Sequence, residues 1–312
     1  MAQQVDSDVF PPLPLEQWED TKDTLHLFLQ IVGKIRLGLF PKTNHWWHVP
    51  LYVSSRGCTT RAIPYGARNF AMSFDFIDHA LKICTSDGEQ KTVPLNGLSV
   101  ADFYRSVFDY LKKLGIEVSI WAAPYDVPDI STEPFATDTL HATYDGSSAH
   151  TYWRILVAVN SVFQSFRGRF MGKCSPVHLF WHHFDLAVTR FTGREAPPRP
   201  GANIVEREAY SHEVISFGFW PGDKTVREPA FYAYGAPVPD GLADEPLEPE
   251  AAVYDSDAGT ALLMYDAVRQ TDAPRETILT FLESFYQAAA RRMILDTGPL
   301  TLPDGGSTTP LK

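Results

Sequence analysis

The chain has 312 residues, 44% hydrophobic and 13% aromatic, enough for a packed core in one large domain or two of ordinary size. Its net charge of −11, with no basic run longer than Arg291-Arg292, argues against nucleic acid or anionic lipid as a partner. The sequence begins without a secretory signal and contains no apolar stretch that would span a bilayer, so we expect a cytoplasmic protein with no membrane partner.

The first part of the chain predicts a long helix followed by antiparallel strands. Apolar residues recur at three-to-four spacing from Leu15 to Phe40, and Pro41 ends this helix. Between residues 70 and 76 the apolar period changes to two, which predicts a strand. Turns are expected at Asp78-His79 and Asp87-Gly88, so the segment is interpreted as an antiparallel meander.

A second helix is predicted after the meander. Ser99 followed by Asp102 resembles a capping box, and Gly115 stands where a helix C-terminus favours glycine. A strand is expected over residues 117–122. The Pro-, Asp- and Thr-rich residues that follow lack periodicity and are typical of a linker.

The same order then begins again. A helix is predicted from about residue 149 to 170, strands over about 177–192, 210–220 and 229–236, and a closing helix from Pro274. Strands grouped apart from helices indicate an α+β fold with helices on one face of antiparallel sheets.

Two tracts suggest an internal duplication. Asn44–Ser54 and Val177–Thr189 each contain His and Trp residues, follow a long helix and lead through an Arg into a Pro-containing turn. We therefore predict two helix–meander–helix units whose sheets meet around a central cavity. The expected divisions are a first repeat at 10–125, a linker at 126–147, a second repeat at 148–293 and a loose tail at 294–312.

The histidines of these tracts raise the question of a metal site. If the tracts are strands, His45 and His48 point to opposite faces, and His178 and His182 lie about 13 Å apart. A single divalent metal would then need ligands from different strands, which leaves the set His45, His178 and His212, with Glu213 or Asp185 as optional further ligands. The alternative is that each ring is a half-buried structural histidine.

A strand over 177–192 would place His183 and Asp185 on one face, with His178 and Arg190 on the other. Asp185 would then orient His183 as a general base. The alternative is a solvated face without chemical function. Cys174 near His178 is a further possible nucleophile, although a buried inert cysteine is the commoner case.

The strand around residue 215 alternates between a core face and a second face that contains small residues. Ser216 and Gly218 stand between His212 and Trp220 on that second face, leaving room for a ligand to approach. This pattern favours the floor of a cavity. The alternative is that Gly218 forms a bulge that bends the sheet.

Side chains that would hold a substrate are expected near these strands. Arg56 and Arg190 follow the two matched tracts, and a guanidinium at a cavity mouth binds carboxylate or phosphate by paired hydrogen bonds. Tyr232 and Tyr234 share a strand face and offer hydroxyl groups. Solvated arginines and tyrosines that only pack are the alternatives.

Several mechanisms lack their defining motifs. The sequence contains no Gly-x-Ser-x-Gly elbow, no Gly-x-Gly-x-x-Gly and no Gly-x-x-x-x-Gly-Lys-Ser/Thr loop, which argues against serine hydrolases and against nucleotide or dinucleotide cofactors. Three cysteines without a Cys-x-x-Cys spacing argue against a disulfide framework or a thiolate zinc site.

A family resemblance covers about residues 10 to 290. The stretches that carry it are Leu15–Thr21, Gln30–Lys34, Asn44–Val53, Phe74–His79, Gly172–His178, Phe184–Phe191, Tyr210–Val214 and Phe219–Gly222. In these the chain resembles an uncharacterised family catalogued as domain of unknown function 5996. The resemblance implies no activity. The His182-His183 pair departs from the family pattern, which shifts the emphasis to His45, His178, Asp185, Arg190 and His212.

The sequence therefore leads to the hypothesis of an enzyme that acts on a small anionic or aromatic molecule in a histidine-lined cavity. The expected acid–base residues are His45, His178, His212 and Asp185, with a divalent metal on the three histidines as a variant. The expected substrate-binding residues are Arg190, Arg56, Trp46, Trp220 and Tyr232. The alternatives are a non-catalytic binding protein and a structural protein without a site. No pattern specifies an oligomeric state.

Overall fold

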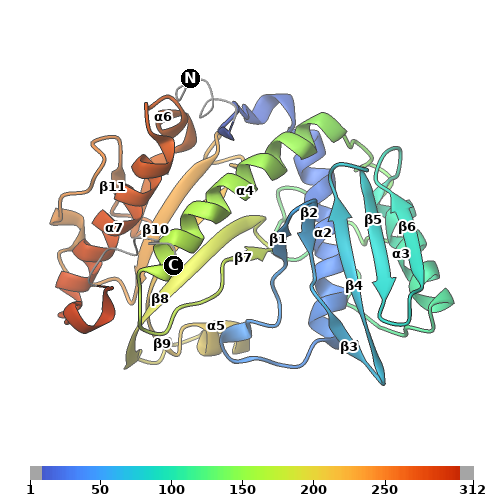
Figure 1. The fold of residues 1–312 in the computed structure, drawn as a ribbon, viewed down its shortest axis with the longest axis horizontal. Helices are drawn as coiled ribbons and strands as arrows, with labels where there is room; N and C mark the ends of the chain where they lie inside the picture. Colours follow the sequence, from blue (N-terminus) through green and yellow to red (C-terminus); the bar gives the residue numbers. More distant parts are fainter. Residues whose placement is uncertain (1–8, 303–312) are drawn as a thin grey trace, which may run out of the picture.

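A computed structural model describes residues 9–302 of the chain. It contains two antiparallel sheets with helices packed on them, so the predicted α+β class is confirmed. Figure 1 shows the two sheets side by side, the first in blue and cyan and the second in yellow and orange. Within the described residues no helix combines the length and apolar character that crossing a membrane requires.

The first sheet has the order β1-β2-β4-β5-β6, with β3 paired to β4. Its strands are β1 (Tyr52–Ser54), β2 (Gly57–Thr59), β3 (Ile63–Tyr65), β4 (Arg68–Asp75), β5 (Ala80–Thr85) and β6 (Gln90–Pro94). The predicted meander corresponds to β4, β5 and β6, and the chain turns at both predicted places, Asp78-His79 and Asp87-Gly88.

The second sheet has the order β11-β12-β10-β9-β8-β7. Its strands are β7 (His178–Phe180), β8 (Asp185–Glu195), β9 (His212–Trp220), β10 (Ala230–Ala236), β11 (Val253–Asp255) and β12 (Thr260–Met264). The sequence predicted β9 and β10 but not β11 and β12, because these two strands are too short for an alternating pattern to stand out.

The long helices follow the apolar stripes that predicted them. They are α2 (Glu19–Leu39), α3 (Val100–Lys113), α4 (Gly146–Gly168) and α7 (Pro274–Arg292). The Ser99 side chain accepts a hydrogen bond from the Asp102 backbone N–H, as the capping pattern predicted. Shorter elements are the helices α5 (Ile204–Ala209) and α6 (Tyr265–Arg269) and the 3₁₀ turns η1 (Leu15–Gln17), η2 (Asn44–Trp46), η3 (Leu242–Asp244) and η4 (Gly298–Leu300).

Helices α4 and α7 cover only one face of the second sheet. Helix α4 packs on β8, and α7 packs on β9 and β10, so both cover the same face (Figure 1). Helix α2 contacts α3 and β3 on the side of the first sheet and also contacts α4. One continuous hydrophobic cluster runs through both halves of the chain, from Phe10 to Met293.

Both matched tracts differ from the strands that the sequence predicted. In the first tract, His45 and Trp46 have left-handed backbone angles within η2, and the strand begins only at Tyr52. The second tract is a hairpin, because residues 181–184 turn the chain between β7 and β8. The two tracts therefore lack a common conformation, and the equivalence of His45 with His178 is not seen.

The segment between the two halves of the chain agrees only in part with the prediction. Residues 117–122, predicted as a strand, have no regular structure, and helix α4 begins at Gly146 after a long irregular segment. The edges of the two sheets meet through an antiparallel bridge between Leu51 and Leu179. The proposed domain limits stay a prediction, and residues 303–312 of the expected tail lie outside the described chain.

Candidate functional site

A cavity of about 1220 Å³ lies on the face of the second sheet that α4 and α7 leave open. Residues of α2, the irregular segment 119–130 and helix α5 surround it. Alternate residues of the strands form its floor: Ala187, Thr189 and Phe191 from β8, Val214, Ser216 and Trp220 from β9, and Tyr232 and Tyr234 from β10. A volume of this order accommodates a small molecule.

Asp185 is the polar centre of this floor. It is 7% exposed, lines the cavity and stands at the start of β8. The Tyr232 hydroxyl donates a hydrogen bond of 2.5 Å to Asp185 Oδ2, while Oδ1 has no partner among the described residues. Burial raises the pKa of Asp185, because the charged carboxylate loses its water and no cation replaces it.

Gly218 allows the contact between Asp185 and Tyr232. It lies on β9, paired with Ala187 on one side and Tyr232 on the other, and the register continues through it without a bulge. A Cβ atom at this position would stand 2.1 Å from the Tyr232 ring. The Tyr232 ring therefore lies over the backbone of β9 at Gly218, where no side chain blocks it. The glycine allows this close contact and does not bend the sheet.

The turn before Asp185 is fixed by helix α2. The Trp181 indole packs against Gly33, where a Cβ would lie 2.2 Å from the ring. His26 Nε2 lies 2.9 Å from the Trp181 carbonyl and 3.1 Å from that of His182, and its N–H donates to them. Burial lowers the pKa of His26 to about 3, so this ring stays neutral at physiological pH.

Two pairs of hydroxyl groups continue the polar floor. Thr189 and Ser216 share a hydrogen bond of 2.8 Å across β8 and β9, and Tyr210 and Tyr234 share one of 2.9 Å. Thr189 lies four residues beyond Asp185 on β8, about 13 Å along the strand, so these hydroxyls line a separate part of the floor. Each hydroxyl group carries one proton and two lone pairs, so this part of the floor can present both donors and acceptors.

Segment 119–130 forms a wall of the cavity and is attached to α2. The Gln30 side-chain amide exchanges two hydrogen bonds with the Tyr125 backbone. Lys34 Nζ donates to the Trp121 and Ala123 carbonyls, at 3.2 and 2.6 Å. Burial lowers the pKa of Lys34 to about 8. The sequence treated the later part of this segment as a linker, since its contacts come from distant residues.

The rings of His45 and His212 lie close together, but only His45 lines the cavity, near helix α5. Their ring centres are 5.5 Å apart. His45 Nδ1 lies 3.1 Å from the Glu208 carbonyl and Nε2 accepts from Lys173 at 2.6 Å, an arrangement that fits the neutral tautomer with a proton on Nδ1. Burial, and then Lys173, lower the pKa of His45.

This histidine pair is remote from Asp185. The His45 ring packs on Phe191, at 4.8 Å between ring centres. Phe191 lies six residues beyond Asp185 on β8, which places the two positions about 20 Å apart at the rise of an extended strand. His45 and Asp185 therefore cannot act on the same atom of a small molecule.

The metal prediction for His45, His178 and His212 is wrong. His178 lies on β7 outside the cavity lining, with its ring against Trp47 and Tyr52. Burial lowers its pKa to about 3. Within residues 9–302 no group of three or more His, Cys, Asp or Glu side chains is placed to hold a metal ion. The prediction failed because neither tract is the continuous strand it assumed.

The predicted relay between His183 and Asp185 is also wrong. His183 Nε2 lies 2.8 Å from Asp126 Oδ2 at the exposed edge of the wall segment. The hairpin turn reverses the chain between His183 and Asp185, so the alternation that placed them on one face does not apply.

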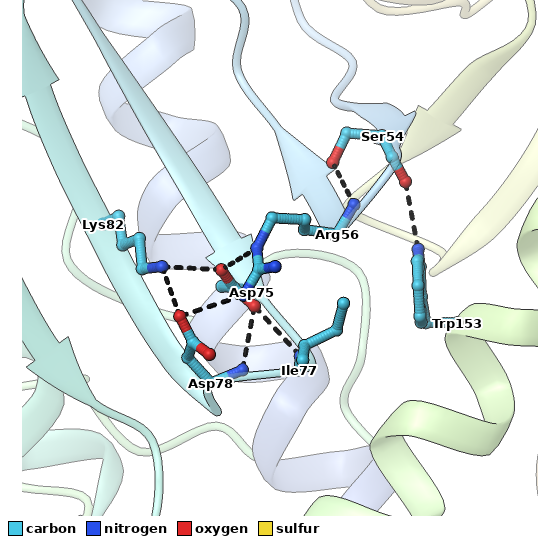
Figure 2. A network of polar contacts seen from close by, with 7 residues as sticks. All are labelled: Ser54, Arg56, Asp75, Ile77, Asp78, Lys82 and Trp153. Atoms are coloured by element: carbon cyan, nitrogen blue, oxygen red, sulfur yellow. Dashed lines mark hydrogen bonds and ion pairs between the residues drawn. The ribbon is translucent and has the colours of Figure 1, made fainter.

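The two predicted substrate arginines lie away from the cavity. Arg56 lies at the turn between β1 and β2, and Figure 2 shows its side chain pointing toward Asp75 and Asp78. The guanidinium lies 2.6 Å from the Asp75 carboxylate and 3.0 Å from that of Asp78. Arg190 points to the helical face, donates to the Phe166 carbonyl at 2.6 Å and pairs with Glu283 at 3.4 Å. Both guanidiniums hold protein elements together, and neither faces a ligand.

The three aromatic residues predicted to bind a substrate do line the cavity, unlike the two arginines. Trp46, Trp220 and Tyr232 all line it, and the Trp220 and Tyr232 ring centres are 5.6 Å apart. Asp185 and Tyr232 were both candidates, but their pairing across β9 was missed. The glycine at 218, opposite a tyrosine on the neighbouring strand, is the signal that points to it.

Comparison with known proteins assigns a family but no activity. No curated protein and no solved structure matches the chain. A family model described as "Family of unknown function (DUF5996)" matches residues 10–301, nearly the whole length. The chain therefore belongs to the DUF5996 family of unknown function.

Proposed function

We propose that this protein binds a small ring-containing molecule in the cavity of the second sheet and transfers a proton to or from it through Asp185. The supporting observation is a buried carboxyl group that lines the cavity with only one of its two oxygens hydrogen-bonded. A carboxyl group whose pKa is raised by burial is suited to general acid–base catalysis near neutral pH.

In this proposal the residues around Asp185 have separate roles. Asp185 gives its proton to the substrate or accepts one from it, and the Tyr232 hydroxyl donates to the carboxylate that remains after donation. The rings of Trp220 and Tyr232 pack against the substrate and exclude water. The hydroxyls of Thr189 and Ser216 orient its polar groups.

A non-catalytic binding protein is the second candidate, and one observation favours it. Asp185 has a side-chain hydrogen bond to Tyr232, and no histidine or second carboxylate among the described residues bonds to it. A lone carboxyl group can anchor a ligand without a partner to complete a proton relay. Turnover separates the two candidates.

A screen of ring-containing compounds tests the proposal. The library holds cationic, neutral and anionic compounds, and calorimetry measures their binding to the wild type, Asp185→Asn and Tyr232→Phe. We expect at least one compound to lose about tenfold or more in affinity in both variants. Asp185→Asn removes a charged hydrogen-bond partner worth about 1.5–3 kcal/mol, and Tyr232→Phe removes the hydroxyl that positions it. Asp266→Asn is the control, because this exposed residue lies outside the cavity lining.

Mass spectrometry of each bound compound after incubation then measures turnover. Conversion by the wild type and not by Asp185→Asn supports the enzyme. Binding that depends on Asp185 without conversion supports the second candidate. If no compound binds in a way that depends on Asp185, both candidates are wrong.

A further inference from the structure

We propose that the ligand of this cavity is an organic cation, a protonated amine carried on a ring, whose ammonium group binds Asp185. This inference rests on the proposed function and specifies its ligand class. It also replaces the anionic substrate that the sequence suggested, because the residues that would have held an acidic group lie elsewhere.

The charges around the cavity favour a cation. Its lining includes the acidic residues Glu19, Asp23, Asp126, Asp129, Asp185, Glu206 and Asp223, against the basic residues Lys22, Lys34 and Lys224, and no arginine. Lys22 is paired with Asp23 at 2.5 Å and Glu19 with Arg227 at 2.6 Å, so these two acidic residues add no net charge. The remaining five acidic residues of the lining still outnumber Lys34 and Lys224, and such an excess favours cations over carboxylates or phosphates.

Asp185 lacks the positive partner that a buried carboxylate needs. No lysine, arginine or histidine of residues 9–302 forms an ion pair with it, and Oδ1 accepts no hydrogen bond. Leaving a buried acceptor without a partner costs free energy, and an ammonium group supplies both the charge and the missing donor. A neutral alcohol would supply the donor alone, and an anion neither.

The rings near Asp185 suit the same ligand. Trp220 lies 5.6 Å from Tyr232 between ring centres, and Tyr232 is stacked on Tyr234 at 6.1 Å. Aromatic faces attract ammonium groups and pack on the ring that carries them. The cavity wall already holds one such contact, with Lys34 Nζ 4.7 Å from the Trp121 ring centre.

Three probes of nearly equal size separate the ligand classes: benzylamine, benzyl alcohol and benzoate. Each is titrated by calorimetry into the full-length wild type, Asp185→Asn and the control Asp266→Asn. We expect benzylamine to bind the wild type at least tenfold more tightly than benzyl alcohol, and benzoate to bind more weakly than both. Asp185→Asn should remove the preference for the amine, and Asp266→Asn should retain it.

The outcomes distinguish this inference from the proposed function. The cationic class is overturned if benzylamine does not bind, if benzyl alcohol or benzoate binds as tightly as benzylamine, or if Asp185→Asn keeps the amine preference. If benzyl alcohol or benzoate binds as tightly as benzylamine and this binding depends on Asp185, the cationic ligand class is wrong but the cavity is still the binding site. The proposed function itself is overturned if the library screen finds no compound, of any charge, whose binding depends on Asp185.

Discussion

The two faces of the second sheet each bury a charged residue from β8, and the two residues are treated differently. On the helical face, Arg190 has a counter-charge in Glu283, a carbonyl acceptor in Phe166 and the Phe166 ring 3.5 Å from its guanidinium. On the open face, Asp185 has one tyrosine hydroxyl and no counter-charge among the described residues. Arg190 lies only five residues beyond Asp185 on the same strand.

This difference indicates which residue stabilises the fold and which awaits a ligand. A buried charge that is paired within the protein holds elements together, and its removal leaves the partner unpaired. A buried charge without a partner lowers stability, and chains retain such groups mainly where binding or catalysis needs them. The comparison therefore predicts that replacement of Arg190 and of Asp185 changes stability in opposite directions.

The largest effect is expected for Arg190→Met. The substitution removes a buried cation that donates to the Phe166 carbonyl and lies 3.5 Å from the Phe166 ring centre, and we expect the free energy of unfolding to fall by about 3 kcal/mol. Urea denaturation measures it. Arg169→Met is the matched control, because Arg169 lies 3.6 Å from the same Glu283 but at the partly exposed surface, and a loss below about 1 kcal/mol is expected. Equal losses in the two variants would show that the burial of Arg190 is not what matters.

Gly218→Ala should have the next largest effect. The new methyl group would collide with the Tyr232 ring, so we expect a loss of about 2 kcal/mol in unfolding free energy together with loss of binding that depends on Asp185. Gly168→Ala is the control, since that glycine ends α4 with no atom near its Cβ position, and its stability should equal or slightly exceed the wild type. Retained ligand affinity in Gly218→Ala would mean that the pairing of Tyr232 with Asp185 is dispensable.

The sequence predicted the elements with strong periodicity and failed where tertiary contacts decide the backbone. The stripes of α2, α3, α4 and α7 and the alternation of β4, β9 and β10 are local, and these elements were found. The turn at residues 181–184 interrupts an apolar run without glycine or proline. Its position depends on Trp181 packing against Gly33, which lies about 150 residues earlier, so no local pattern could reveal it.

The candidate site was predictable to the same extent. Alternation on β9 correctly grouped Val214, Ser216 and Trp220 on the face that lines the cavity. Alternation also placed Asp185 and Arg190 on opposite faces of β8, as the structure has them, but it could not tell which of the two faces lines the cavity. The unrecognised turn before Asp185 takes His183 away from it, because alternation holds only within one continuous strand.

Asp185→Asn tests the other half of the comparison and should stabilise the protein. The pKa of Asp185 is raised in the folded state, so the folded chain holds this proton more tightly than the unfolded chain does. The stability of the wild type therefore falls as the pH rises from about 4 through the raised pKa, and the variant escapes this loss. We expect a gain of about 1 kcal/mol at pH 8 that shrinks towards zero near pH 4. Thermal or urea unfolding across this range measures it, and a destabilised variant at pH 8 would contradict the unpaired state of Asp185.

The smallest effect is expected for Asp126→Asn, which asks whether any acidic residue around the cavity serves as well as Asp185. Asp126 also lines the cavity, but its side chain is 57% exposed and pairs with His183. Exposed pairs contribute little to stability, and water screens their charge, so the unfolding midpoint should match the wild type and benzylamine affinity should fall by less than about threefold. If calorimetry finds a loss as large as in Asp185→Asn, the ammonium group binds at the mouth of the cavity. In that case the burial of Asp185 would not be what distinguishes it from the exposed Asp126 in ligand binding.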